Sequence, residues 1–302
     1  MSSTLYLIGN GFDKANELPT SYNDFRNYLK TKYGRNQEKS TYRFFPIKKK
    51  NMLAPNDYQN VELMIAMIDS SLSRVYGEKQ DWRHFEDILG KLKYEDLWKE
   101  KNRNELNGII SHVAFTRLRD YFREWILDVD VEKAKPIEDF PQDREALYLS
   151  FNYTLTLEKI YHILPDNVCH IHGVSGDKEL IFGHKGNRFE YMKDESMAER
   201  QIVIVREMLQ KDTEACYIEH QDFFNKIDKK IKEIVSIGFS YSDVDMYYIE
   251  KIIKKVGMNT TWYIHMYNAE EVLEFKHKLR KSGFYGKIRM FKNIGCYKNC
   301  IK

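Results

Sequence analysis

The residues of this sequence that could do chemistry gather in short turns, each of which follows an apolar run. The first turn, Gly9-Asn10-Gly11-Phe12-Asp13, comes directly after the apolar run 4–8. Glycines in such a turn permit positive φ and let backbone N–H groups approach a phosphate closely. Gly9 and Gly11 fit the first two positions of a dinucleotide-binding fingerprint, but Lys14 stands where the third glycine belongs. The spacing therefore leaves a nucleotide-binding loop and a plain turn both open.

Polar side chains in the first two turns could contact a ligand. Asn10 and Asp13 can hydrogen-bond a ribose or an amide, although both residue types also stabilise turns by bonding their own backbone. The second turn, 151–154, follows the run 146–150 and contains Asn152. Since the carboxyl ends of parallel strands meet at one edge of a sheet, we expect Asn152 beside the glycine turn. A helix N-cap at Asn152 or Thr154 is the alternative.

Two histidines, His170 and His172, stand one residue apart before Gly173. On a strand, alternate residues share a face, so both rings are expected on the same side. His172 would end the strand at the ligand edge, where a histidine can act as a general base near neutral pH. His170, further down the strand, fits a hydrogen-bonded, half-buried residue. His184 follows another apolar run, and the three histidines could together hold a metal, although no supporting carboxylate is evident.

A late turn repeats the architecture of the first one. The run 233–237 leads into Gly238, and Ser240, Ser242 and Asp243 follow it. A flexible backbone and hydroxyl groups suit a ribose or a phosphate, whereas Ser242 or Asp243 could instead cap the next helix. Several such turns at one expected edge are stronger evidence for a ligand site than any one turn alone.

A sheet must position these turns. Short apolar runs predict strands, and helical patterns separate most of them, which predicts an α/β fold with a mostly parallel, Rossmann-like sheet flanked by helices. Helical patterns at 61–76, 82–100 and 106–129 predict a large helical insertion after the first strand. We therefore expect a nucleotide-binding core of residues 1–20 and 146–302, with residues 21–145 packed on it or capping it. The expected strands are 4–8, 146–151, 167–173, 179–184, 233–240, 261–267 and 287–291.

The composition narrows the class of protein. Of 302 residues, 42% are hydrophobic, so the chain can bury a substantial core. The charges nearly cancel to +3 without a concentrated basic patch, so nucleic acid is not an expected partner. The four cysteines form no CxxC pair, which argues against a four-cysteine zinc site and fits reduced thiols. The sequence shows neither a signal-peptide pattern nor a membrane-length apolar segment, so we expect a cytoplasmic protein that spans no membrane.

Five stretches taken together resemble the bacteriophage abortive-infection AbiH family: 8–25, 149–161, 170–173, 181–184 and 237–252. The same stretches look like a divergent sirtuin-like NAD-binding fold, in which a Gly-Ala-Gly-x-Ser turn follows the first strand. Residues 9–13 stand in place of that turn, and 150–154 are similar to the Thr-x-Asn-x-Asp motif of that fold. His172-Gly173 matches its essential His-Gly pair. Residues 238–240 resemble its late turn, which contacts the adenosine half of NAD.

The resemblance implies roles for individual residues, and the sequence also departs from it. Asp13 replaces a small serine, Thr154 replaces an aspartate, and the paired cysteines of the deacetylase zinc module are absent, so NAD hydrolysis is implied rather than protein deacetylation. Asn152 would position water or the ribose, His172 would act as a base near the ribose hydroxyls, and Asp13 would orient the ribose or stabilise developing positive charge. No metal is expected. The nucleotide-contacting set is Gly9, Asn10, Gly11, Phe12, Gly173, Gly238, Ser240, Ser242 and Asp243.

The function implied by the resemblance is anti-phage abortive infection, in which the activated protein hydrolyses NAD at the nicotinamide–ribose bond and halts growth. One alternative is a nucleotide-binding sensor or toxin component without catalysis. Another is a metal-dependent nuclease or phosphohydrolase built on the histidines. A phage-derived trigger and a homo-oligomer are both left open by the sequence.

Overall fold

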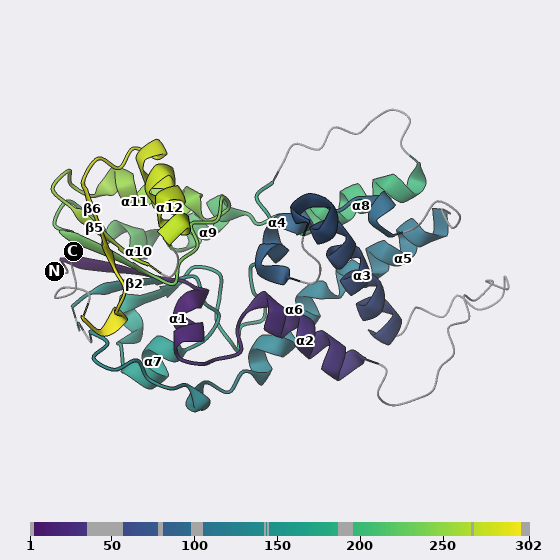
Figure 1. The fold of residues 1–302 in the computed structure, drawn as a ribbon, viewed down its shortest axis with the longest axis horizontal. Coiled ribbons are helices and arrows are strands. Elements are labelled where there is room, and N and C mark those ends of the chain that lie inside the picture. The colour runs from purple at the N-terminus through teal and green to yellow at the C-terminus, as the bar shows by residue number, and fades with distance from the viewer. Residues whose placement is uncertain are drawn as a thin grey trace. The chain divides into compact units, whose positions relative to one another are not determined.

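The computed structural model describes residues 3–34, 57–77, 81–97, 105–141, 143, 145–186, 196–266 and 269–296 (Figure 1). Its internal contacts divide the chain into two compact units. The first unit comprises residues 1–20, 126–181 and 212–302, and the second comprises residues 21–125 and 182–211. Within the described ranges, no helix is long and apolar enough to cross a membrane.

The first unit is built on a parallel sheet. Its strands are β1 (Thr4–Ile8), β2 (Leu147–Ser150), β3 (Val168–His170), β4 (Glu233–Ile237), β5 (Thr261–His265) and β6 (Lys287–Phe291). They are hydrogen-bonded in the order β3-β2-β1-β4-β5-β6, and every pair is parallel. This is the strand order of the Rossmann fold, so the predicted fold class is confirmed. Central strands such as β1 are wholly buried, which explains their continuous apolar sequence.

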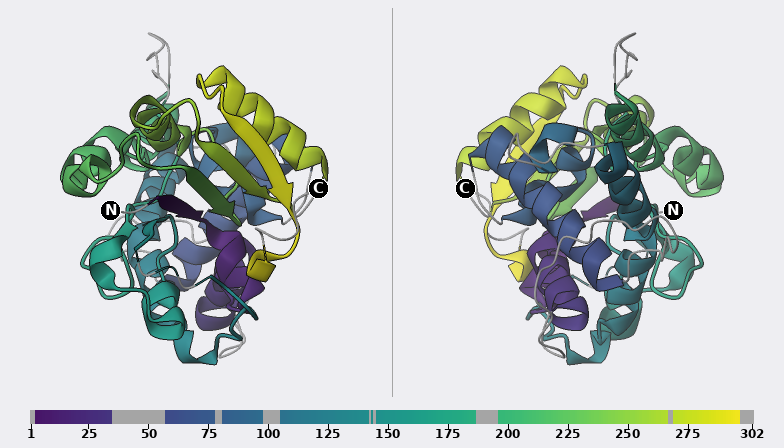
Figure 2. Two further views of the ribbon diagram at one scale, coloured as in Figure 1. Left: turned by 90° about the vertical axis from the view of Figure 1, so that its left-hand side faces the viewer. Right: turned by 90° about the vertical axis from the view of Figure 1, so that its right-hand side faces the viewer.

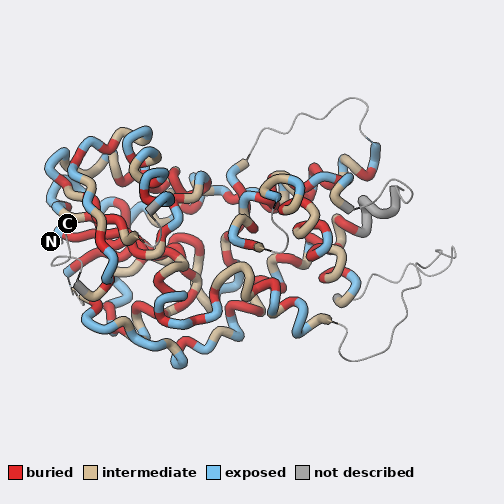
Figure 3. The backbone as a smooth tube through the Cα atoms, in the orientation of Figure 1, coloured by how far each residue is buried: buried red, intermediate tan, exposed pale blue. Residues whose placement is uncertain are grey.

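Helices cover both faces of this sheet (Figure 2). One face buries Leu5, Leu7 and Ile234 against α9 (Thr213–Glu219), α10 (Gln221–Asn225), α11 (Met246–Lys255) and α12 (Ala269–Lys281). The other face buries Tyr6, Tyr148 and Val235 against α1 (Asn10–Ala15) and α7 (Thr156–Tyr161). Successive strand residues therefore alternate between two cores, and the buried residues follow the strands in Figure 3.

The second unit is helical. Its helices are α2 (Tyr22–Tyr33), α3 (Asp57–Tyr76), α4 (Phe85–Leu89), α5 (Glu105–Thr116), α6 (Leu118–Asp128) and α8 (Met197–Met208). The last residues of α6 belong to the first unit. Ser21 begins α2 with a capping box, in which its hydroxyl accepts from the Asp24 amide while the Asp24 carboxylate accepts from the Ser21 amide. The ring of Phe25 packs on the rings of Trp82, Phe85, Phe122 and Trp125 in the core of this unit.

Four segments differ from the sequence-based expectation. The run 179–184 forms no strand, and only His184 makes an isolated bridge, to Gln210, so that prediction is wrong. The pattern 82–100 is broken after α4, where Gly90 ends the helix. Residues 182–211, expected in the core, pack with the second unit because α8 lies against α5. Residues 126–145, expected in the insertion, belong to the first unit, where the ring of Phe140 contacts those of Tyr6 and Phe12.

Candidate functional site

The glycines after β1 pack against the turn after β4. Gly9 is the N-cap of α1, so the expected loop is in fact the first turn of a short helix. The Gly9 amide donates to the Ile237 carbonyl at 3.0 Å, and the Gly11 amide donates to the Gly238 carbonyl at 2.9 Å. A Cβ added at Gly9 would lie 2.5 Å from the Gly238 oxygen, and one added at Gly11 would lie 2.5 Å from the Gly238 Cα. We call Gly9, Gly11 and Gly238 the glycine clasp.

The glycine clasp corrects one expectation about phosphate binding. A Cβ at Gly238 would lie 2.3 Å from the Phe12 nitrogen, so all three positions of the clasp need glycine for close approach. Gly238 also needs glycine for its conformation, since its φ is +60°. Because the Gly9 and Gly11 amides already donate to carbonyls of the β4 turn, they do not point freely at a diphosphate, as the fingerprint suggested. The glycines therefore bring the turns after β1 and β4 together at the switch point of the sheet.

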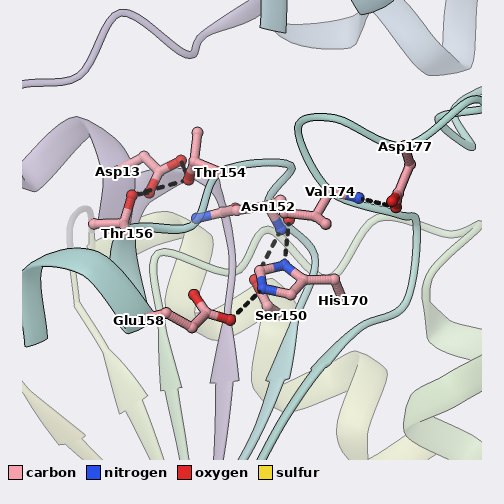
Figure 4. A network of polar contacts seen from close by, with 9 residues as sticks. All are labelled: Asp13, Ser150, Asn152, Thr154, Thr156, Glu158, His170, Val174 and Asp177. Atoms are coloured by element: carbon pink, nitrogen blue, oxygen red, sulfur yellow. Dashed lines mark hydrogen bonds and ion pairs between the residues drawn. The ribbon is translucent and has the colours of Figure 1, made fainter. Parts of the chain in front are cut away.

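Beside the clasp, Asp13 is held inside the first unit (Figure 4). It is 1% exposed, and its carboxylate accepts from Thr154 Oγ1 at 2.6 Å and from Thr156 Oγ1 at 3.0 Å. Burial raises the pKa of Asp13 from 3.8 to about 6, and hydrogen bonds from Thr154, Thr156 and Asn152, with the charge of His170, limit the rise. Asp13 is therefore mostly ionised at pH 7 but close to its titration range.

Asn152 links the turn after β2 to the turn after β1. Its Nδ2 donates to the Gly9 carbonyl at 3.1 Å, and its backbone amide donates to Ser150 Oγ at 3.2 Å. The Asn152 Oδ1 is buried and has no hydrogen-bond partner among the described residues. A buried amide oxygen of this kind can accept a hydrogen bond from a hydroxyl or a water.

His170 ends β3 next to Asn152 (Figure 4). Its Nδ1 lies 3.1 Å from the Asn152 carbonyl oxygen, and its Nε2 lies 2.8 Å from Glu158 Oε1. Burial works against a charge on this ring, but Glu158, the Asn152 carbonyl and Asp13 together raise its pKa above the ordinary value. The histidine that the sequence marked as the less functional of the pair thus contacts the Asn152 turn directly.

His172 lies in a second cluster. The strand ends at His170, so the expectation that His172 is the last strand residue is wrong, and strand alternation does not relate the two rings. His172 is 2% exposed, with Nε2 3.5 Å from Asp245 Oδ1 and ring contacts to Phe151, Tyr153 and Tyr248. Asp245 in turn accepts from Ser242 Oγ at 2.8 Å, which places part of the late turn beside this histidine.

The remaining candidates occupy different environments. Asn10 accepts from Thr20 Oγ1 at 2.7 Å, Ser240 is exposed, and the exposed Asp243 pairs with Lys278 at 3.0 Å. Gly173 has φ of +83° and turns the chain after His172. His184 belongs to the second unit, where its ring nitrogens lie near the backbone carbonyls of Lys185 and Arg206. In the part of the chain that is described, no group of three or more His, Cys, Asp or Glu side chains is arranged to hold a metal ion.

Comparison with known proteins identifies the family. A model of the family described as bacteriophage abortive infection AbiH matches residues 5–266, a span that runs from β1 to just past β5 and includes the whole helical unit. The chain belongs to the AbiH family. Searches of curated proteins and of solved structures give no match. Membership assigns this protein to anti-phage abortive infection, and the matched span contains every candidate residue named above.

Three residues of this AbiH protein join the site without having been picked out from its sequence. Thr156 and Glu158 stand in what the sequence shows only as a helical pattern, and Asp245 follows the late serines. The sequence holds no usable signal for Thr156 and Glu158, because α7 begins only at Thr156 and their contacts are made to other elements. Taken in strand order, contacts join the ends of β3, β2, β1 and β4 through His170, Asn152, Gly9 and Gly11. The arrangement combines an acid, an unpaired amide oxygen and two histidines at the carboxyl edge of a Rossmann sheet.

Proposed function

We propose that this AbiH protein binds NAD at the carboxyl ends of β1 to β4 and, when activated by infection, hydrolyses the bond between nicotinamide and ribose. The topology supports this location, because ligands of open α/β sheets bind where the strand order reverses, which here is between β1 and β4. The glycine clasp lies at this point, and Asp13 and Asn152 stand next to it. The resemblance of the sequence motifs to a sirtuin-like NAD-binding fold supports NAD as the nucleotide.

The observation that carries the proposal is the buried carboxylate of Asp13 beside Asn152. In the proposed reaction the C1′–N bond breaks, nicotinamide leaves with the bonding electrons, and water adds its oxygen to C1′ and releases a proton. The ribose passes through an oxocarbenium-like state whose positive charge a nearby carboxylate stabilises. Asp13, with a pKa of about 6, supplies that charge at pH 7. The Asn152 Oδ1 would accept from the attacking water or a ribose hydroxyl.

Other residues take supporting roles in the proposal. His172, oriented by Asp245, would act as the base near the ribose hydroxyls. Since the Gly9 and Gly11 amides bond to the β4 turn, we assign them to building the site, and contacts to the nucleotide fall to polar groups of the turns. Exposed Ser240 and Asp243 suit the adenosine half. No step in this scheme uses a metal.

The second candidate is nucleotide binding without catalysis, in a sensor or a toxin component that works through a partner. The burial of Asp13 favours it, because a carboxylate that accepts from two threonines can serve to hold the turns together. A phage-derived trigger or a second copy of the chain would then convert the bound form into an effector.

The test is release of nicotinamide from NAD by the purified protein, with and without lysate of phage-infected cells. We expect turnover in at least one condition and a loss of at least about a hundredfold in Asp13→Asn, Asn152→Ala and His172→Ala. Asp166→Asn, which removes an exposed carboxylate elsewhere in the first unit, should keep full turnover. Absence of turnover in every condition overturns hydrolysis, and NAD binding measured by calorimetry in that case supports the second candidate.

A further inference from the structure

The hydrogen-bond partners of both His170 ring nitrogens favour its charged form. The Asn152 carbonyl can only accept, so Nδ1 of His170 must carry a proton to donate to it at 3.1 Å. The carboxylate of Glu158 also accepts, so Nε2 must carry a proton to donate to it at 2.8 Å. Donation from both nitrogens favours the imidazolium, and although burial opposes the charge, Glu158 and the Asn152 carbonyl raise the pKa of His170 above its ordinary value.

The groups around His170 come from three elements. Glu158 faces it from α7, the Asn152 carbonyl faces it from the turn after β2, and Asp13 of α1 acts on it through its charge. Asp13 interacts electrostatically with His170 and with the phenol of Tyr161, whose pKa burial raises so that it stays neutral. His170 is thus a buried cation next to one carboxylate and within electrostatic reach of a second.

Two consequences follow for the turn that carries the site. The bond from Nδ1 holds the Asn152 carbonyl, and Asn152 begins the segment 152–156 whose threonines donate to Asp13. The positive ring also favours the ionised form of Asp13, and in return Asp13 favours the protonated ring. The charges of His170 and Asp13 are therefore coupled.

We propose that His170 is a positioning residue of the site, which as an imidazolium paired with Glu158 holds the segment 152–156 in place and stabilises the negative charge of Asp13. The step to catalysis rests on the proposed NAD hydrolysis, but the coupling itself does not depend on any ligand. Glu158 acts on the segment only through His170, because its carboxylate favours the charged form of that ring.

The experiment measures the titration of the Asp13 carboxyl by ¹³C NMR in protein labelled at aspartate, with Asp13→Asn used to assign its signal. In His170→Gln the neutral amide keeps a donor but removes the charge, and we expect the Asp13 midpoint to rise to higher pH. Glu158→Gln should raise it in the same direction by weakening the charge on His170. His277→Gln, on an exposed face of α12, is the matched control and should leave the midpoint unchanged.

Each outcome separates this proposal from the proposed function. If His170→Gln and Glu158→Gln both leave the Asp13 midpoint where it is in the wild type, the coupling is refuted, whatever the protein does with NAD. If the Asp13 midpoint rises in the two variants but neither they nor the wild type release nicotinamide, the coupling is supported and the proposed hydrolysis is refuted. If wild type is active, the acidic limb of its pH profile should move to higher pH in Glu158→Gln, a change that a purely structural role of His170 would not produce.

Discussion

Replacing Asp13 by asparagine removes a negative charge from the interior of the first unit while keeping the shape of the side chain. The pKa of Asp13 rises from 3.8 to about 6 on folding because burial penalises the carboxylate. Each tenfold difference in proton affinity corresponds to about 1.4 kcal/mol. Ionised Asp13 should therefore reduce the free energy of unfolding by about 3 kcal/mol, a cost that asparagine does not carry.

The pH dependence of this effect has a definite sign. A carboxyl with a raised pKa binds its proton more tightly in the folded state than in the unfolded one, so its contribution to stability falls as pH rises from about 4 to about 6. Below that window both states are protonated and the variant has little advantage. We expect the free energy of unfolding of Asp13→Asn to exceed that of wild type only slightly at pH 4 and by about 3 kcal/mol at pH 7.

The assays are urea unfolding and thermal unfolding of both proteins at several pH values, followed by circular dichroism and by tryptophan fluorescence. For a unit of this size, about 3 kcal/mol corresponds to a rise in Tm of roughly 6–12 °C. Asp166→Asn, at an exposed position, should show no such difference. An advantage of Asp13→Asn that stays constant or shrinks with rising pH would refute the reasoning. If Asp13 serves function at the expense of stability, Asp13→Asn should be more stable than wild type but inactive.

Two further substitutions test the architecture around the site. Gly238→Ala would place a Cβ 2.3 Å from a backbone nitrogen, and we expect it to cost about 3–5 kcal/mol, against about 1–2 kcal/mol for Gly283→Ala, which has positive φ but nothing within 4 Å. Equal costs by thermal unfolding would show that close approach does not explain Gly238. Ser21→Ala removes the hydroxyl that caps α2 and should lower the stability of the helical unit by about 1 kcal/mol. The same loss should not follow from Ser240→Ala, an exposed serine in the first unit.

Much of the fold could be predicted because parallel strands are buried on both faces. The runs that became β1, β2 and β4 read as continuous apolar segments bounded by glycine or polar turns. The run 179–184 has the same character, since Leu180 and Phe182 are buried, yet it pairs with no strand. An apolar run indicates that a segment is buried. A strand also needs a neighbouring strand whose backbone can hydrogen-bond to it, and the sequence alone does not show that neighbour.

The positions of the candidate residues could be predicted where they depend on topology and not where they depend on the residue at which a strand ends. Asp13 and Asn152 were expected at one edge of the sheet, and hydrogen-bonded contacts do bring their turns together. The surroundings of the two histidines depend on where β3 ends. Because the strand ends two residues earlier than expected, the His170 ring contacts the Asn152 turn and the His172 ring lies in an aromatic cluster beside Asp245. Strand boundaries are the least certain part of any sequence-based assignment.

The glycines after β1 show why a partial fingerprint is weak evidence for a phosphate site. A phosphate loop and a close contact between two turns both need residues without Cβ, so the sequence requirement is the same. What separates them is the direction of the amides, and here the amides of Gly9 and Gly11 point to carbonyls of the β4 turn. The case for a ligand at this edge therefore rests on Asp13 and Asn152. Asp13→Asn decides between the two uses of this buried carboxylate, which costs about 3 kcal/mol at neutral pH, because a carboxylate that only holds the turns is not needed for turnover.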